Sequence, residues 1–212
     1  LTMVLPPAQA AAVLVVPSLV TNLWLVVDGA HLREVSARLA PLLVGLCIGT
    51  ALGIGVLTGS NTQPAALALG VLLALYGYAG VRDYRLRVPI HRERWLTPLV
   101  GLTTGGITGA TGVFVVPAVP FIASLGLGRD ALMQAMGLSF TVSTAALAIA
   151  LVARGAFAPS DAVVSALALV PAVLGMALGR ALRRRLSEAA FRRWFFISVI
   201  ALGVQMVVRA LG

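Results

Sequence analysis

The feature that most constrains this chain is its long stretches without a charged residue. From Pro41 to Val81, for example, no Asp, Glu, Lys or Arg occurs. An apolar run of about 18 residues or more without charges is typical of a membrane span rather than of a soluble core. Charged residues make up only 11% of the 212, whereas a soluble domain carries about 25%. The sequence therefore excludes a soluble enzyme, a secreted disulfide scaffold and a disordered tail, and indicates a polytopic membrane protein.

Seven apolar segments follow one another along the chain. Lipid tolerates only helices or closed barrels, and no alternating strand pattern supports a barrel. We therefore expect an all-α polytopic membrane helix bundle. The expected segments are residues 8–27, 38–57, 64–81, 95–127, 130–153, 159–182 and 187–211.

An internal repeat relates the first three segments to the last three. Residues 49–53 (Gly-Thr-Ala-Leu-Gly) match residues 175–179 (Gly-Met-Ala-Leu-Gly), and residues 9–10 (Gln-Ala) match residues 134–135 (Gln-Ala) at nearly the same spacing. The fourth segment then has no partner within the chain. We expect its counterpart upstream of Leu1, which agrees with a sequence that does not begin with Met.

The fourth segment, residues 95–127, is too long and too interrupted for one plain span. A straight helix of this length would measure about 45 Å, against roughly 30 Å of hydrocarbon. Its centre, residues 101–112, is rich in glycine and threonine, and Pro117 and Pro120 follow. Such residues either permit close helix packing or let the helix break beside a cavity. The packing alternative rests on glycines at every fourth position: Gly101, Gly105 and Gly109.

The arginines distinguish a single span from a re-entrant hairpin. All 16 basic residues are Arg, and they lie at or near segment ends. With a single span, nine arginines would face one side of the membrane and seven the other. With a hairpin that dips in and returns, 14 face one side, and only Arg154 and Arg209 face the other. Because basic residues concentrate on the cytoplasmic side, this distribution favours the hairpin.

Each repeat would then be a broken, re-entrant segment plus three spans, an odd number, so the two repeats are predicted to be inverted. Residues 1–94 form the incomplete first repeat and a cytoplasmic loop, and residues 95–212 form the second, with its hairpin at 95–127. Inverted repeats with broken helices are a transporter architecture. The net charge of +9 reflects the loop arginines, so we expect the lipid bilayer and not nucleic acid as partner, with a homo-oligomer left open.

The chain offers little for catalysis or metal binding. Its two histidines, His31 and His91, lie in charged loops, and the single Cys47 leaves no disulfide and no cysteine metal site. Gly137-Leu-Ser139 is similar to the nucleophile setting of an intramembrane serine protease, but no histidine lies within a span as its base. No carboxylate lies mid-span for a proton relay. We therefore expect no enzyme, no metal and no cofactor.

Uncharged polar groups at membrane depth remain as candidate ligands. Backbone N–H groups and hydroxyls can hold a small anion without a buried cation. Serine and threonine within spans more often join helices to one another, and this alternative stays open for each residue. The candidate substrate-binding residues are Thr104, Gly105, Thr108, Gly109, Thr111, Gly112, Gln134, Ser139, Ser143 and Asn22.

Several motifs occur in order along one stretch of the chain. Residues 101–112 read Gly-x-x-x-Gly-x-x-x-Gly-x-x-Gly, residues 125–130 read Leu-Gly-Leu-Gly-Arg-Asp, and residues 139–144 read Ser-Phe-Thr-Val-Ser-Thr. This stretch resembles the TauE/SafE family of sulfite and organic-anion exporters, although the family's glycine run is usually richer and its first-repeat run is absent. The resemblance implies a secondary transporter that exports sulfite, an organosulfonate or a related anion across the bacterial inner membrane. The alternative is a non-transporting membrane scaffold with a packed glycine seam.

Overall fold

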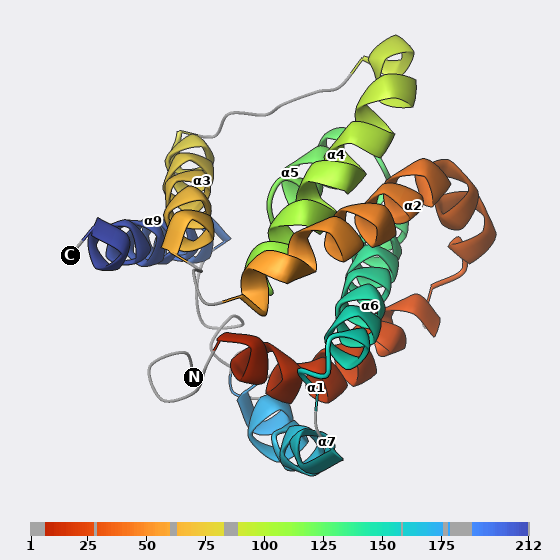
Figure 1. The fold of residues 1–212 in the computed structure, drawn as a ribbon. Helices are drawn as coiled ribbons and strands as arrows, with labels where there is room; N and C mark the ends of the chain where they lie inside the picture. The colour runs from red at the N-terminus through yellow and green to blue at the C-terminus, as the bar shows by residue number, and fades with distance from the viewer. Residues whose placement is uncertain are drawn as a thin grey trace.

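The structure is a computed structural model that describes residues 7–27, 29–59, 63–82, 89–157, 159–175, 178 and 188–211. All regular elements within these residues are helices, which confirms the all-α fold (Figure 1). The helices are α1 (Pro7–Val27), α2 (Leu32–Leu57), α3 (Gln63–Val81), α4 (Ile90–Thr111), α5 (Ala118–Ser124), α6 (Arg129–Ala153), α7 (Pro159–Leu167) and α9 (Glu188–Leu211).

Five of these helices, α1, α2, α3, α6 and α9, are long and apolar enough to cross a membrane. α4 is not among them, because its glycines, threonines and charged first turn lower its hydropathy. The expected sixth span, residues 159–182, is described only in part: α7 and a shorter apolar helix, Val163–Gly175, cover its first portion. Its last residues lie outside the described part of the chain.

Two helices begin earlier than expected. α2 starts at Leu32 instead of residue 38, since Glu34 in its first turn suits a helix N-terminus and Val35 is buried against the bundle. α4 starts at Ile90, directly after the extended Pro89, instead of at residue 95. Both extensions contain charged residues, which an apolar-run criterion leaves out of a span.

α2 and α4 pack against each other through their backbones and run parallel. A Cβ atom on Gly45 would lie 2.8 Å from the Leu102 nitrogen, and one on Gly109 would lie 2.8 Å from the Ile54 nitrogen. Residue numbers increase together along the two helices, which fixes their relative direction. No side chain fits between them, so these glycines serve close helix packing.

The predicted break in the fourth segment occurs at Gly112. α4 ends at Thr111, and Gly112 adopts a left-handed conformation with φ 75°. Its N–H donates to the Thr108 carbonyl at 2.7 Å. Glycine is favoured at such a cap because a Cβ atom is strained there. Residues 113–117 then lead into the short α5.

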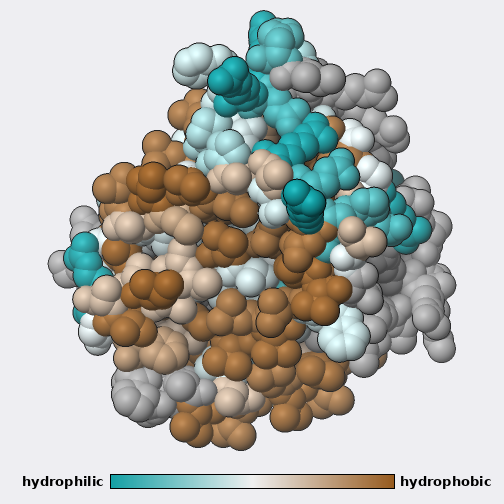
Figure 2. Space-filling view, turned by 90° about the vertical axis from the view of Figure 1, so that its right-hand side faces the viewer, coloured by the Kyte–Doolittle hydropathy of each residue, from teal (hydrophilic) through white to brown (hydrophobic). Residues whose placement is uncertain are grey.

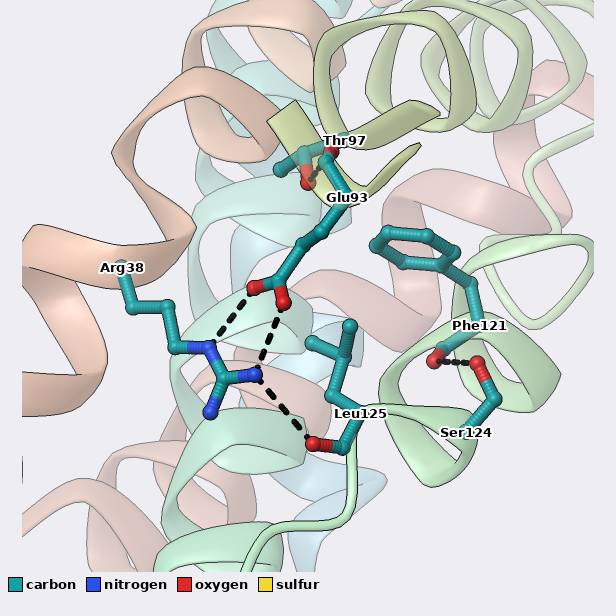
Figure 3. A network of polar contacts seen from close by, with 6 residues as sticks. All are labelled: Arg38, Glu93, Thr97, Phe121, Ser124 and Leu125. Atoms are coloured by element: carbon teal, nitrogen blue, oxygen red, sulfur yellow. Dashed lines mark hydrogen bonds and ion pairs between the residues drawn. The ribbon is translucent and has the colours of Figure 1, made fainter. Parts of the chain in front are cut away.

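One arginine links both ends of the α4–α5 unit. Arg38 on α2 donates from Nε to Glu93 Oε1 at 2.7 Å, and from Nη2 to Glu93 Oε2 at 2.9 Å and to the Leu125 carbonyl at 3.2 Å (Figure 3). The hydrogen bonds that Glu93 accepts from Arg38 lower the pKa of its carboxyl group. Glu93 lies in the first turn of α4, and Leu125 follows α5 directly. The chain therefore returns to the level at which α4 began, as a helical hairpin.

α1 and α6 form an antiparallel pair. Gly137, early in α6, faces Leu25 near the end of α1, whereas Leu147 shares an apolar cluster with Ala12. α6 also packs along α2, so the hairpin, α2, α6 and α1 form the central body of the described structure.

α3 and α9 form a second antiparallel pair beside this body (Figure 1). The Gln63 side chain at the start of α3 donates to the Ala210 carbonyl at the end of α9, and Gly80 near the end of α3 lies against Phe196. Both antiparallel pairs join segments that the sequence repeat relates, the first with the fifth and the third with the seventh.

The described arginines separate between the two ends of the helices. One end, here called the arginine-rich end, carries Arg33, Arg38, Arg82, Arg92, Arg94, Arg129 and Arg193. The opposite end carries Arg154 and Arg209. The arginines at 85, 87, 180 and 183–185 lie outside the described residues.

All three tryptophans lie near the arginine-rich end and are exposed. Trp24 is three residues from the end of α1, Trp95 is in the second turn of α4, and Trp194 is in the second turn of α9. Tryptophan favours the membrane–water interface. Figure 2 shows the matching pattern on one face, with hydrophilic side chains gathered at one end above a broad apolar surface. This end therefore has the composition of a cytoplasmic interface.

Topology gives the first testable prediction. In a Cys47→Ala background, a cysteine replacing Ala156 should react with an impermeant maleimide applied outside the cell, while one replacing Arg129 should be protected. The reason is that Ala156 follows α6 at the arginine-poor end, whereas Arg129 begins α6 at the arginine-rich end. Permeabilised cells provide the control, since both positions should then react. Ready labelling at 129 with protection at 156 would contradict the hairpin topology.

Candidate functional site

Five hydroxyl side chains are buried where α2, α4 and α6 face one another. Each has an exposed fraction of 1% or less. They are Thr50 on α2, Thr104 and Thr108 on α4, and Ser139 and Ser143 on α6. We call these residues the hydroxyl cluster.

The α6 members face α2 because of their helical spacing. Ala135, Ser139, Ser143 and Leu147 are four residues apart and therefore share one face of α6. At one end of this face, Ala135 packs in an apolar cluster with residues 35–42 of α2; at the other, Leu147 packs with residues 54–57. The two serines between them must face the intervening stretch of α2, which contains Thr50.

The α4 members reach the same level through the parallel register of α2 and α4. Gly105 lies against the Leu46 backbone, and Gly109 lies against Thr50 and Ile54. Thr104 and Thr108 each precede one of these glycines by one residue. They therefore lie beside the stretch of α2 that contains Thr50, and both are completely buried.

Three of the five hydroxyls have no hydrogen-bond partner among the residues that the structure describes: Thr50 Oγ1, Thr104 Oγ1 and Ser139 Oγ. Thr108 instead donates to the Thr104 carbonyl of its own helix at 2.8 Å. An unsatisfied buried polar group costs about 1–3 kcal/mol, so native proteins keep few of them without a functional reason. Three unsatisfied hydroxyls lie on neighbouring helices within the hydroxyl cluster. We therefore regard the cluster as a candidate binding site.

The helix break lies beyond the hydroxyl cluster, towards the arginine-poor end. Thr111 donates to the Ile107 carbonyl at 2.7 Å and accepts a hydrogen bond from the Val113 N–H at 3.2 Å. A Cβ atom on Gly112 would lie 3.3 Å from Ala11 Cβ. After the break, Phe114 lies on Phe140 of α6, with ring centroids 5.0 Å apart. The break therefore adjoins α1 and α6 near the C-terminal turns of α2.

Gln134 lies elsewhere and has structural partners. Its Nε2 donates to the Val26 and Gly29 carbonyls, both at 2.7 Å, and its Oε1 accepts from the His31 N–H at 2.9 Å. These bonds use both of its donor hydrogens and hold the turn between α1 and α2. Gln134 has no N–H left for an anion, so we do not include it in the proposed site.

The structure also separates three other candidates from the hydroxyl cluster. Gly105 and Gly109 face the α2 backbone, where a Cβ atom would collide with the carbonyl groups of Leu46 and Thr50. Asn22 is half-buried on α1 with its carbonyl beside Gly137, on the side of α6 that faces α1. The two glycines therefore have a packing role, and Asn22 is not placed on the α2-facing side of α6.

Thr50 is the one member of the hydroxyl cluster that the sequence analysis missed. It lies inside Gly49-Thr-Ala-Leu-Gly53, which the sequence analysis considered only as one copy of the internal repeat. In the structure, Gly49 and Gly53 pack against the backbone of α4. A signal was present, because the related residues 175–179 have methionine where Thr50 stands. A polar residue that stands in one copy of a repeat, where the other copy has an apolar residue, is a candidate for a functional role.

Comparison with known proteins gives one match. The sequence model of a family described as sulfite exporter TauE/SafE matches residues 1–206. No curated protein and no solved structure matches the chain significantly.

Proposed function

The chain belongs to the sulfite exporter TauE/SafE family, and on this basis we propose that it is a secondary transporter that exports a small sulfur-containing anion. Sulfite, an organosulfonate or a related anion is the proposed substrate. The bacterial inner membrane is the proposed location. The five membrane-spanning candidates and the polar, buried hydroxyl cluster between α2, α4 and α6 support this assignment.

The single observation that carries the proposal is the set of unpartnered hydroxyls. An anion that leaves water loses its hydration and needs hydrogen-bond donors in return. Hydroxyl groups supply such donors, and Thr50, Thr104 and Ser139 have theirs unused. Thr108 and Ser143 line the same place, and Thr111 with Gly112 shapes the adjoining break. We propose these residues as the substrate pathway.

The α4–α5 hairpin is the proposed moving element. It carries Thr104 and Thr108, and it is fastened to α2 at the arginine-rich end by the Arg38–Glu93 ion pair and the bond to the Leu125 carbonyl. The hydroxyl cluster is closed to solvent with this link formed. We propose that the hairpin opens first towards one side of the membrane and then towards the other, so that the hydroxyl cluster is exposed to each side in turn. The proposed architecture for this motion is the pair of repeats 1–94 and 95–212.

A non-transporting scaffold is the second candidate function, and the glycine seam between α2 and α4 favours it. Backbones that touch over several turns form a rigid pair of helices. A scaffold would keep the hydroxyl cluster permanently dry. It would also show no solute movement after reconstitution.

Transport in proteoliposomes separates these two functions. Vesicles that contain the full-length protein and are preloaded with unlabelled sulfite should accumulate external labelled sulfite by counterflow, whereas protein-free vesicles should not. Sulfonates and sulfate, tested in the same way, define the substrate range. Absence of counterflow for all of these anions would overturn the transporter assignment.

Ser143 gives a second prediction. Ser143→Ala should raise the half-saturating anion concentration by roughly 5- to 30-fold, the equivalent of about 1–2 kcal/mol for one lost hydrogen bond to a charged partner. The Ser143→Ala protein is expected to fold, because the substitution removes only one oxygen atom from a buried side chain. Ser198→Ala is the matched control, since Ser198 is exposed on α9 and bonded to the Trp194 carbonyl. An unchanged half-saturating concentration in Ser143→Ala would remove Ser143 from the pathway.

A further inference from the structure

The three unpartnered hydroxyls come from three different helices. Thr50 belongs to α2, Thr104 to α4 and Ser139 to α6, and none is more than 1% exposed. Back-bonding to the helix carbonyl four residues earlier is the usual way to satisfy such a hydroxyl, and neighbouring residues use it: Thr108, Thr111 and Thr144 all do so. The three unpartnered residues do not, so their hydroxyl hydrogens remain available to a ligand.

The stretches of α2, α4 and α6 that carry these hydroxyls contain no charged residue. α1, α3 and α5 contain no charged residue. The charged residues and histidines of α2, α4 and α6 lie at or next to the helix ends: His31, Arg33, Glu34, Arg38, His91, Arg92, Glu93, Arg94, Arg129, Asp130 and Arg154. Cys47 lies in the middle of α2, where it is exposed. At 1.5 Å per residue, Arg38 lies about 18 Å along α2 from Thr50, and Arg94 about 15 Å along α4 from Thr104. The guanidinium group of Arg154 comes nearer, because it lies against Gly55, about 7.5 Å along α2 from Thr50. No cation is therefore in direct contact with a ligand at this place.

The absence of a cation restricts the charge that the site can hold. The cost of moving an ion from water into a medium of low dielectric constant is large and rises with the square of its charge. Neutral hydroxyl donors can offset part of this cost for one negative charge. A divalent anion would face about four times the cost, which three neutral hydroxyl donors do not offset.

We propose that Thr50, Thr104 and Ser139 form one three-hydroxyl site that takes sulfur oxoanions in their monovalent form, as hydrogen sulfite or a sulfonate, and rejects divalent sulfite and sulfate. The inference rests on the proposed transport function and specifies its substrate. A monovalent –SO₃ group has three oxygens, which equals the number of unpartnered hydroxyl donors on the three helices. Hydrogen sulfite and sulfite interconvert near neutral pH, so the same compound tests both charges.

The first experiment compares substrates by counterflow in proteoliposomes of the full-length protein. Sulfite transport should rise as the pH is lowered through neutrality, in proportion to the hydrogen sulfite fraction, while sulfate should not be transported. Methanesulfonate keeps one charge over this range and therefore reports any effect of pH on the protein itself. Sulfate transport, or sulfite transport that does not follow the hydrogen sulfite fraction, would overturn the charge selection. If no anion moves, the transport function itself fails, which is a distinct result.

The second experiment tests the three hydroxyls. Thr50→Val and Thr104→Val should each raise the half-saturating methanesulfonate concentration roughly tenfold or more, since each removes a donor to a charged ligand. Thr103→Val is the matched control on α4, because Thr103 is exposed and bonded to the Leu99 and Val100 carbonyls. Thr50→Ser, which restores the hydroxyl, should recover transport.

Thermal unfolding distinguishes a ligand-binding role of Thr50 from a purely structural one. Without anion, Thr50→Val should be as stable as wild type or more stable, because it removes an unsatisfied buried hydroxyl. Methanesulfonate should raise the unfolding temperature of wild type and of Thr103→Val, but much less that of Thr50→Val. Equal stabilisation of Thr50→Val and wild type by methanesulfonate, with normal transport, would overturn the three-hydroxyl site.

Discussion

Replacing Gly112 by valine should abolish anion transport while the protein remains in the membrane. Gly112 has a φ of 75°, which a β-branched residue adopts only with strain, and a Cβ atom there would lie 3.3 Å from Ala11 Cβ. The strain falls at the tip of the hairpin, next to α1, where the chain reverses. Helix α4 and its seam with α2 lie on the other side of this point and keep their contacts. Counterflow in proteoliposomes, with the protein quantified by immunoblot, measures the loss.

Two further variants separate the role of this tip from general backbone strain. Gly155→Val introduces the same kind of strain at φ 64°, but a Cβ atom on Gly155 meets nothing within 4 Å, so transport should persist. Gly112→Asn should retain part of the activity, since asparagine tolerates the left-handed conformation. Normal transport at normal affinity by a well-folded Gly112→Val protein would contradict the role assigned to the break.

Replacing Gly49 by valine should instead reduce the amount of folded protein several-fold. A Cβ atom on Gly49 would collide with the Leu102 carbonyl and lie 2.6 Å from the Gly106 nitrogen. Both are backbone atoms that cannot move as a side chain can, so α2 and α4 would have to separate. Overpacking of this kind costs about 1–3 kcal/mol or more, which is enough to lower steady-state abundance. The measurement is the quantity of monodisperse protein recovered from membranes.

Gly105 and Gly106 provide a matched pair for the same seam. A Cβ atom on Gly105 would collide with the Leu46 carbonyl, whereas one on Gly106 would meet nothing within 4 Å. Gly105→Ala should therefore lower the unfolding temperature. Gly106→Ala should leave it unchanged or raise it, because alanine is favoured over glycine within a helix. Equal effects of the two alanines would show that the seam does not depend on close backbone contact.

The sequence predicts the hairpin from two global properties of the chain. Residues 95–127 are too long for one span, and the arginines divide almost evenly between the two sides of the membrane unless this segment returns to its starting side. It could not predict that Arg38 fastens both ends of the hairpin. Glu93 and Leu125 are 55 and 87 residues from Arg38 in sequence, and only the folded chain brings them together.

Side-chain roles at the site were harder to predict, because helical faces are determined by neighbours. Ser139 and Ser143 were expected near the glycine segment, and the structure places them on the α2-facing side of α6. Gln134, on the same helix, points to the α1–α2 turn, where its amide N–H groups donate to backbone carbonyls. Its amide suits an anion and a helix terminus equally well. Composition alone gives no means to choose between these two partners.

The assignment of Gly101, Gly105 and Gly109 shows the same limit. Their spacing fits both a packed seam and a helix that opens beside a cavity. The partner stripe on α2, with Gly45, decided the matter in favour of packing. Among the glycines of residues 101–112, Gly112 lies outside this spacing and has the left-handed conformation that ends α4.

Accessibility of the hydroxyl cluster tests the central claim most directly. In a Cys47→Ala background, Ser143→Cys should react with an impermeant thiol reagent supplied from either side of the vesicle membrane, and methanesulfonate should slow the reaction. Ala156→Cys, which follows α6 at the arginine-poor end, controls for general reactivity, because methanesulfonate should not protect it. A transporter predicts two-sided access with protection by the anion. A cysteine at 143 that reacts from neither side, or that reacts equally with and without methanesulfonate, would contradict a path for anions through this cluster.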